Sequence, residues 1–553
     1  MRWIQRHPVP AVLAAFALAY LVGLDTHDVT NWQEGIRLLT AMDMSDRGDW
    51  IVPTIHGEPY LAKPPLIYWA TLVAAEARSR LAGPPSPTLF DLRLVAALSG
   101  LLGIAATYWA GRVLWFDRDE QPDQGSTHPR ELAHRMALWS AALAGTGVLF
   151  VRSSRIGELD VLLIPTVAGT VASCGHALLG RSVGERLAGV ALALACSALA
   201  ALAKGPAGLL VIGCAVPVGI SVGAFFSDDP VARRARRVAL AWGLTLACAG
   251  AGLGAVWLWS RAVAARIGPD AVAAAVSTES GENLRLLVPD AWLKYLEGMS
   301  YGAGLASLLT LLALWRLVTQ RPPGRRRLGW GGWIVLAWVL ASFVAFSLTT
   351  KGVVRYLTPV WPALGLLGGW WLVQRIDETR DRPREKPREF CLVVIVMLAV
   401  AQAVWYSYGR EWGSSDRSFR AMARELLTIR EADAPLVRPG LVGSYDLWQP
   451  GMEIALGVPV TPWAGPANTS DTPHTTPEPI ETLAEGLRSG EYHRYLLLVR
   501  DGVEPGRPEA GLAIDQLEAL GLEVTRVETE AAWTIDNGKT SVVPVVLSAP
   551  HSN

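Results

Sequence analysis

Long apolar runs recur along the chain, and short polar segments separate them. A run of about 17–25 apolar residues can cross a bilayer as a single helix. The runs predict about eleven such helices, at residues 9–24, 91–114, 136–152, 161–179, 187–203, 206–225, 238–260, 303–318, 330–348, 356–374 and 390–408. Only Lys204-Gly205-Pro206 separates the fifth run from the sixth, so one long kinked helix is the alternative to two spans there.

Basic residues are unevenly divided among the loops between these runs. Every second loop is rich in them, and the loops in between hold few. Cytoplasmic loops of membrane proteins carry an excess of lysine and arginine, so we expect the basic loops and the N-terminus in the cytoplasm. With an odd number of spans, residues 409–553 then lie outside, in a bacterial periplasm or its equivalent. The basic residues of the expected cytoplasmic loops are Arg118, Arg130, Arg135, Arg181, Arg186, Arg233, Arg234, Arg236, Arg237, Arg325, Arg326, Arg327, Arg382, Arg384, Lys386 and Arg388.

The hydrophobic pattern changes after the last run. This change predicts a boundary between a transmembrane domain, residues 1–408, and a C-terminal domain, residues 409–553. Apolar segments as short as buried strands alternate there with segments of helical periodicity, which predicts a small α/β domain. The expected helices are residues 418–431 and 511–520, the expected strands are 441–445, 495–499, 522–530 and 540–548, and a loop is expected at 466–479.

The composition supports a membrane location. Hydrophobic residues make up 51% of the 553 residues and charged residues 18%, whereas soluble domains have roughly a quarter charged residues. The mean hydropathy is +0.27. Basic and acidic residues balance at 50 each, so the charge indicates no nucleic-acid partner. All five cysteines lie in apolar runs without CxxC or histidine spacing, so we interpret them as small buried hydrophobes and expect no metal site.

The first outward segment, residues 25–90, is too long for a simple connection between two membrane helices. Helical periodicity over residues 31–44 predicts an amphipathic helix at the membrane surface. The segment is rich in acids and aromatics and also holds Lys63. A carboxylate placed there can remove a proton from an incoming hydroxyl, and a lysine can neutralise a phosphate. Solvated surface residues are the simpler interpretation of each acid.

Three cations lie on the outward side, against the general bias of charge. Lys204 precedes the sixth span, and Lys351 and Arg355 precede the tenth. Their placement indicates anion binding, with anchoring to lipid headgroups as the alternative. Asp160 directly precedes the fourth span, where an ionised group is costly to bury without a partner. A helix N-cap is the alternative role for this acid.

Two segments of the first loop resemble the first periplasmic loop of bacterial polyprenyl-phosphate-dependent glycosyltransferases: residues 48–53 (GDWIVP) and 57–69 (GEPYLAKPPLIYW). This family includes the lipid A aminoarabinose transferase and the protein mannosyltransferases, and it has a GT-C fold. The similarity continues at residues 155–160, 202–206, 355–359 and 362–363, so its motifs extend over most of residues 1–410.

The resemblance implies a polytopic α-helical membrane enzyme of the GT-C type. Such enzymes take a sugar from a polyprenyl-phosphate carrier and pass it to a lipid, glycan or protein acceptor on the outer face of the bacterial cytoplasmic membrane. The implied reaction is one inverting displacement, in which a carboxylate activates the acceptor. It needs no cofactor and no metal ion, and its partners are the lipid-linked donor, the acceptor and membrane lipids.

The family's first loop carries an acidic pair before the Gly-Asp-Trp motif. Counted without gaps, this pair falls on Gln33 and Glu34, which makes Glu34 the preferred base. A shift of a few residues brings Asp28 into the place of the family's aspartate, so Asp28 is the second choice. Asp160 matches the acid of the second periplasmic loop and is the third catalytic candidate.

The resemblance also implies substrate-binding residues. Lys63 would contact the carrier phosphate, and Tyr60 would line the donor site. Ala62 stands where the family often has an acid, which speaks against a metal ligand there. The remaining candidates for holding the lipid phosphate and the sugar are Lys204, Lys351, Arg355 and Tyr356.

Two other classes of protein fit parts of the pattern. A transporter or lipid flippase would use the same outward charges as a substrate path, but transporters often show paired interrupted helices, and the only interruption is at Gly205-Pro206. A non-catalytic membrane protein with a partner-binding outer domain is the third hypothesis.

Overall fold

The chain folds into two compact units in the computed structural model. The helical unit comprises Met1–Leu24, Thr40–Thr54 and Pro59–Ser407, and the sheet unit comprises Asp25–Leu39, Ile55–Glu58 and Tyr408–Asn553. The division assigns two segments of the first loop to the same unit as the C-terminal residues, which the sequence did not predict. The structure describes residues 8–26, 28–29, 32–81, 83, 85–115, 129–274, 288, 290–319, 328–349, 352–378, 397–398, 401–402, 404–405, 419–431, 434–445, 450–464, 478–489, 491–492, 494–501, 510–527, 533–535 and 540–549.

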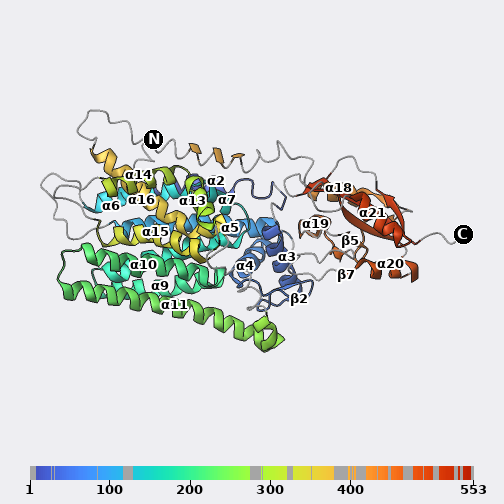
Figure 1. The fold of residues 1–553 in the computed structure, drawn as a ribbon, viewed down its shortest axis with the longest axis horizontal. Coiled ribbons are helices and arrows are strands. Elements are labelled where there is room, and N and C mark those ends of the chain that lie inside the picture. The colour runs from blue at the N-terminus through green and yellow to red at the C-terminus, as the bar shows by residue number, and fades with distance from the viewer. Residues whose placement is uncertain are drawn as a thin grey trace. The chain divides into compact units, whose positions relative to one another are not determined.

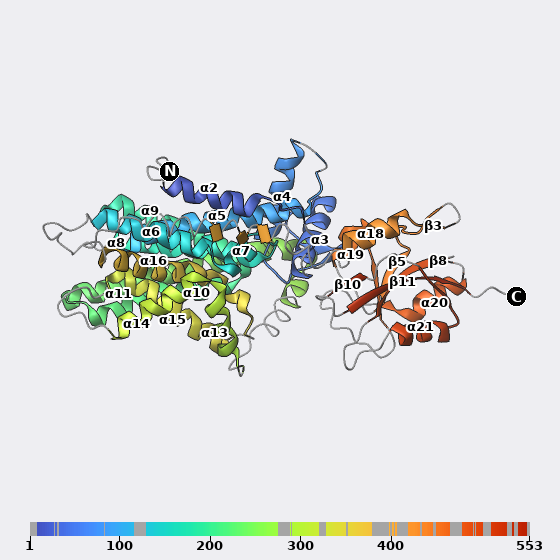
Figure 2. The same cartoon turned by 90° about the horizontal axis from the view of Figure 1, so that it is seen from above.

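The helical unit consists of long apolar helices that lie alongside one another, as Figure 1 and the turned view in Figure 2 show. Helix α3 (Trp32–Arg47) is divided between the two units. The other helices are α2 (Pro8–Leu21), α4 (Leu66–Ser79), α5 (Leu89–Leu114), α6 (Pro129–Gly145), α7 (Val148–Ser153), α8 (Leu163–Leu179), α9 (Val183–Lys204), α10 (Pro206–Phe226), α11 (Val231–Ile267), α13 (Ala291–Gly302), α14 (Leu305–Thr319), α15 (Trp330–Thr349) and α16 (Trp361–Glu378), with the 3-10 helices η1 (Leu159–Leu162) and η2 (Val354–Val360).

A polytopic helical membrane protein is confirmed. Among the described residues, 6 helices are long and apolar enough to cross a membrane, or up to 7 if α13 and α14, which are bent by 110° to each other, form one span. The first six overlap predicted spans, but of the bent pair only α14 does, because α13 falls in residues that were expected to form an outward loop. The last predicted span, residues 390–408, falls almost entirely outside the described residues.

The fifth and sixth predicted spans are two separate helices, so the alternative of one kinked helix is wrong. α9 ends at Lys204, and the N–H of Gly205 donates to the carbonyl of Ala201 at 2.7 Å. Gly205 has φ 61°, a conformation that glycine adopts without the steric cost of a side chain. Pro206 then begins α10, where its missing N–H is not needed.

Three predicted spans are broken near one end. The third consists of α6 and α7 with a break at Thr146 and Gly147, the fourth begins with η1, and the tenth begins with η2. Non-helical backbone at membrane depth occurs where protein buries it or where it lines a polar cavity. These breaks fall where the chain carries the charged residues Arg152, Asp160 and Arg355.

The sheet unit is built on seven strands in the order β10-β11-β8-β5-β6-β7, with β9 also paired to β11. β8, β5, β6 and β7 run parallel, and β11 is antiparallel to β8. Buried residues such as Leu483, Leu497 and Val545 form its core. The elements are α18 (Phe419–Thr428), β3 (Arg430–Glu431), β4 (Ala434–Pro435), β5 (Val442–Tyr445), α19 (Pro450–Leu456), β6 (Thr461–Ala464), β7 (Glu478–Pro479), α20 (Ile480–Ser489), β8 (Arg494–Asp501), α21 (Ala510–Ala519), β9 (Glu523–Arg526), β10 (Trp533–Ile535) and β11 (Thr540–Ser548), and the first loop adds β1 (Thr54–Ile55) and β2 (Glu58–Pro59).

The predicted C-terminal elements correspond to elements of the structure. The two expected helices are α18 and α21, and the four expected strands are β5, β8, β9 and β11. The expected loop at 466–479 lies outside the described residues except for its last two, which form β7. The short elements α19, β6 and α20 carry too few residues for a clear period and were not predicted.

Candidate functional site

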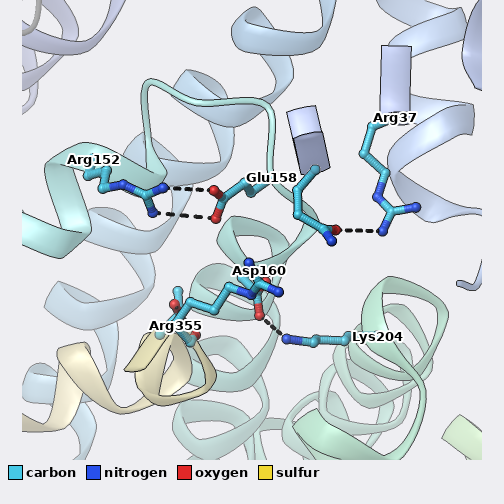
Figure 3. A network of polar contacts seen from close by, with 8 residues as sticks. Arg37, Arg152, Glu158, Asp160, Lys204 and Arg355 are labelled. Carbon is cyan, nitrogen blue, oxygen red and sulfur yellow. Dashed lines mark hydrogen bonds and ion pairs between the residues drawn. The ribbon is translucent and has the colours of Figure 1, made fainter. Parts of the chain in front are cut away.

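Charged side chains gather where η1, η2 and the end of α9 meet (Figure 3). Asp160 lies in η1, Lys204 is the last residue of α9, and Arg355 lies in η2. Asp160 forms an ion pair with Lys204 through Oδ1, and its Oδ2 lies 4.0 Å from Nε of Arg355. The fold thus joins three of the predicted site residues from distant parts of the sequence. We call this group the Asp160 cluster.

The acid of this cluster is buried more deeply than its cations. The side chain of Asp160 is 5% exposed, that of Lys204 13% and that of Arg355 36%. A buried carboxylate is costly unless cations pair with it. Asp160 is paired with two cations, so the group carries an excess of positive charge, and its more accessible part is cationic. Such an arrangement suits an anionic ligand.

Tyr356 supports the position of the lysine. Nζ of Lys204 lies 4.1 Å from the centroid of the Tyr356 ring, a cation–π contact. The predicted substrate-binding tyrosine therefore contacts one of the predicted cations. Its neighbour Arg355 is the second cation of the cluster, so both η2 residues contribute to it.

A second ion pair lies in the same network in Figure 3. Arg152, at the end of α7, donates to Glu158 at 2.9 Å, and a second N–H lies at 3.5 Å. The side chain of Glu158 is 3% exposed and that of Arg152 32%. As in the Asp160 cluster, a buried acid holds a more exposed cation. The sequence analysis singled out Asp160 and the segment 155–160 but not this pair.

The Gly-Asp-Trp motif forms the end of α3. Gly48 has φ 65°, and the N–H groups of Gly48 and Asp49 donate to the carbonyls of Ser45 and Met44, both at 3.1 Å. This is the Schellman arrangement, in which a left-handed glycine closes a helix. Asp49 Oδ1 then accepts from the N–H groups of Ile51 at 2.8 Å and Val52 at 3.3 Å. The motif therefore has a clear role in shaping the first loop.

Two other helices hold this turn. The indole N–H of Trp69 in α4 donates to the carbonyl of Trp50 at 2.6 Å, and that of Trp259 in α11 donates to Ile51 at 3.0 Å. Arg266 near the end of α11 pairs with Asp49. Burial raises the pKa of Asp49, but hydrogen bonds from the Ile51 amide, Arg266 and the Val52 amide lower this pKa below its ordinary value overall.

Tyr60 and Lys63 follow this turn in the helical unit. Tyr60 is buried, and its N–H donates to the carbonyl of Pro53 at 2.8 Å. Lys63 is half-buried and precedes α4, which begins after Pro64 and Pro65. The structure therefore places both candidates in the unit that holds the Asp160 cluster.

The two candidate bases belong to the sheet unit. Glu34 is buried in the first turn of α3, and Asp28 is half-buried before the helix begins. A negative charge in the first turn is also favoured by the helix dipole, which gives Glu34 a structural role whatever its chemistry. The choice between the two as the base stays a prediction.

The last predicted candidate, Lys351, lies outside the described residues. Over the part of the chain that the structure describes, no group of three or more His, Cys, Asp or Glu side chains is arranged to hold a metal ion.

Arg155 is a residue whose role the sequence missed. It is buried and donates to the carbonyls of Ala19 at 2.6 Å and Val22 at 2.7 Å, at the end of α2. The last carbonyls of a helix have no partner within it, so Arg155 caps α2. Its place in the glycosyltransferase-like segment 155–160 therefore reflects the fold, whereas Asp160 in the same segment faces the cations.

Solved structures establish the class of fold. The crystal structure of ArnT from Cupriavidus metallidurans bound to undecaprenyl phosphate has a TM-score of 0.66 with this chain, at 18% identity and over 97% of both chains. The apo state of the same protein gives 0.65 over the same shares. The chain therefore has the fold of ArnT, a GT-C glycosyltransferase, as the first-loop motifs predicted.

Curated relatives point to a particular kind of enzyme. Over 388 residues the chain is 26% identical to undecaprenyl phosphate-alpha-4-amino-4-deoxy-L-arabinose arabinosyl transferase 2 of Pseudomonas fluorescens, covering 68% of this chain and 58% of that protein. The arabinosyl transferase of Pectobacterium carotovorum is 24% identical over 392 residues, 67% of this chain and 60% of that protein. The match thus spans less than two thirds of the length of these relatives. No family model matches the chain. The resemblance to polyprenyl-phosphate-dependent glycosyltransferases is confirmed.

Proposed function

We propose that this chain is an integral membrane glycosyltransferase that moves a sugar from a polyprenyl-phosphate carrier to a lipid, glycan or protein acceptor. The observation that carries the proposal is the Asp160 cluster. Its cations, Lys204 at the end of α9 and Arg355 in η2, are placed where they could bind an anion. Relatives that are named for arabinosyl transfer from undecaprenyl phosphate support a donor of this type and a pentose as the sugar.

The proposed reaction is a single inverting displacement. Glu34, or Asp28 in its place, takes the proton of the acceptor hydroxyl while the acceptor oxygen forms a bond to the anomeric carbon. The bond from that carbon to the phosphate oxygen breaks, and its electron pair leaves with the lipid phosphate. Charge grows on the phosphate as it departs, so cations fixed beforehand lower the barrier. We assign this role to Lys63, Lys204, Lys351 and Arg355, and contact with the sugar to Tyr60 and Tyr356.

The proposal includes a topology and a location. Eleven spans, an N-terminus in the cytoplasm and a periplasmic domain at residues 409–553 follow from the distribution of basic residues. The location is the bacterial cytoplasmic membrane, and the reaction takes place at its outer face. There the isoprenoid tail stays in lipid while the sugar stays in water. The reaction as written uses neither a cofactor nor a metal ion.

The test is sugar transfer by the purified full-length chain in lipid nanodiscs, with an undecaprenyl-phosphate aminopentose as donor and lipid A as acceptor. We expect Glu34→Gln to lower turnover by about 100-fold or more, because general base catalysis contributes that much. Binding of undecaprenyl phosphate should be unchanged. Glu76→Gln, at an exposed acid of α4, is the matched control and should retain full turnover.

The outcome also decides between the rival hypotheses. If Asp28→Asn abolishes turnover and Glu34→Gln does not, the base is Asp28. If both variants transfer sugar like the parent, no carboxylate of the first loop acts as the base, and the mechanism is wrong. Movement of the lipid across the bilayer without transfer of the sugar would identify a flippase instead.

A further inference from the structure

The first half of α3 rests directly against α19 of the C-terminal region. Gly35 follows Glu34 and is buried. A Cβ atom on Gly35 would lie 2.7 Å from Cβ of Pro450 and 3.5 Å from the backbone nitrogen of Gly451. A carbon–carbon approach of 2.7 Å is not tolerated in a packed interior. Glycine thus allows the backbone beside Glu34 to touch the start of α19.

The turn between β1 and β2 is tied to the same short helix. Nε2 of His56 lies 2.7 Å from Oε2 of Glu453, which is buried in α19. The other oxygen of Glu453 accepts the N–H of Val460 at 3.1 Å. His56 has φ 51°, a left-handed conformation that is uncommon for residues with a side chain. Its backbone adopts this conformation at the point where its side chain reaches Glu453.

These two contacts explain why the first loop is divided between the sheet unit and the helical unit. The segments Asp25–Leu39 and Ile55–Glu58 belong to the compact unit of Tyr408–Asn553, although Thr40–Thr54 between them belongs to the helical unit. Both segments contact α19, through Gly35 and through His56. Both candidate bases, Glu34 and Asp28, lie in the first of these segments.

We propose that α19 positions the helix that carries the base, so that Gly35, Pro450 and Glu453 are positioning residues for transfer. This inference rests on the proposed function for its catalytic consequence. It assigns the C-terminal domain a part in the reaction: the domain fixes where the carboxylate of the first loop stands. A displacement of about 1 Å at a reacting group can lower a rate by about 100-fold. A shift of α3 of this size would therefore be measurable as a lower kcat.

The experiment introduces a methyl group at the contact and then makes room for it. Gly35→Ala should lower kcat by about 10- to 100-fold while KM for the lipid-linked donor stays unchanged, because the phosphate is held by residues of the helical unit. Pro450→Gly removes the nearest contact, the Cβ of Pro450, but not Cγ1 of Val29, which the new methyl group would meet at 3.2 Å, so it should restore part of kcat in the double variant. Gly243→Ala in α11 is the control. It also adds a methyl group to a helical glycine, but this group would have no neighbouring atom within 4 Å outside the local helix backbone.

A second measurement tests the contact without reference to catalysis. Glu453→Gln keeps the size of the side chain and weakens its bond to His56, so residues 32–39 and 55–58 should exchange their amide hydrogens faster than in the parent, while α5 is unaffected. Unchanged exchange in this variant, full turnover in Gly35→Ala, or a loss that Pro450→Gly does not restore would each overturn the proposal. If the parent transfers no sugar at all, the proposed function fails, and the exchange experiment alone decides whether α19 holds α3.

Discussion

Buried carboxylates have different roles in the two units. In the helical unit, Asp160 and Glu158 hold lysine and arginine side chains that are more exposed than the acids themselves. In the sheet unit, Glu453 holds His56 with one oxygen and a backbone N–H with the other. The first arrangement leaves cations more accessible than the acids that hold them, which is the basis of the phosphate site we propose, and the second joins segments of the chain. What a buried acid holds is therefore more informative about its role than the fact of its burial.

The largest effect should come from breaking the pair at the centre of the Asp160 cluster. Lys204→Met leaves Asp160 with one distant cation, and removing one partner of a buried pair costs about 3 kcal/mol. We expect turnover to fall by about 100-fold as well, because the departing phosphate loses a cation. Thermal unfolding in detergent and sugar transfer per folded molecule measure the two effects.

A double variant separates stability from function at this site. Asp160→Asn in the Lys204→Met background removes the unpaired charge and should recover most of the unfolding temperature, but not the turnover. Lys204→Arg keeps the charge, so its turnover should fall less than that of Lys204→Met or of the double variant. Recovery of turnover in the double variant would mean that the cluster is only a structural ion pair, as Arg155 and α2 are a structural cap.

Arg155 provides the contrasting case, with the next largest effect. Arg155→Met removes the donors to the carbonyls at the end of α2, and buried groups left without a partner cost about 1–3 kcal/mol. We expect a lower unfolding temperature and unchanged turnover per folded molecule, since the hydrogen bonds described above go to backbone carbonyls at the end of α2. A drop in turnover beyond the loss of folded protein would place Arg155 with the Asp160 cluster.

The sequence predicted the features that depend on local pattern. Hydrophobic length located the helices. The Gly-Asp-Trp motif identified the first loop through its family resemblance, but the turn that Gly48 and Asp49 form came only from the structure. Lys204 and Arg355 stood out because they carry positive charge on the side of the membrane that is poor in it. Their common partner Asp160 was identified as well, through its place at the start of a span.

Other features depend on contacts between distant segments, and no local pattern reports these. The pairing of Arg152 with Glu158 requires the chain to turn back in the short connection between the third and fourth predicted spans, and hydropathy does not report such a turn. Residues 25–39 group with the C-terminal residues, and Gly35 allows a close approach to Pro450 there. The sequence alone does not show that Pro450 lies opposite this glycine. A glycine within an amphipathic helix was the one available signal, because glycine weakens a helix unless packing requires it.

The smallest expected effect concerns Asp49 and Arg266, the most exposed of the ion pairs considered, with side chains 25% and 46% exposed. The pKa of Asp49 is lower in the folded protein than its ordinary value, so the ionised form stabilises the fold. This stabilisation is complete above the ordinary pKa of about 3.9 and is lost as the pH falls through the lower folded pKa.

Asp49→Asn isolates this charge, because asparagine keeps an oxygen that accepts from the Ile51 and Val52 amides. At pH 7 we expect the variant to be less stable than the parent by no more than about 1 kcal/mol, the usual limit for exposed pairs. The difference in unfolding temperature should shrink below about pH 4, and it should vanish at every pH in an Arg266→Gln background if the ion pair is its only source. A difference that persists unchanged at low pH would show that it comes from the poorer fit of asparagine in the turn and not from the charge of Asp49. In that case the charge of Asp49, unlike that of Asp160, contributes nothing measurable to the stability of the fold.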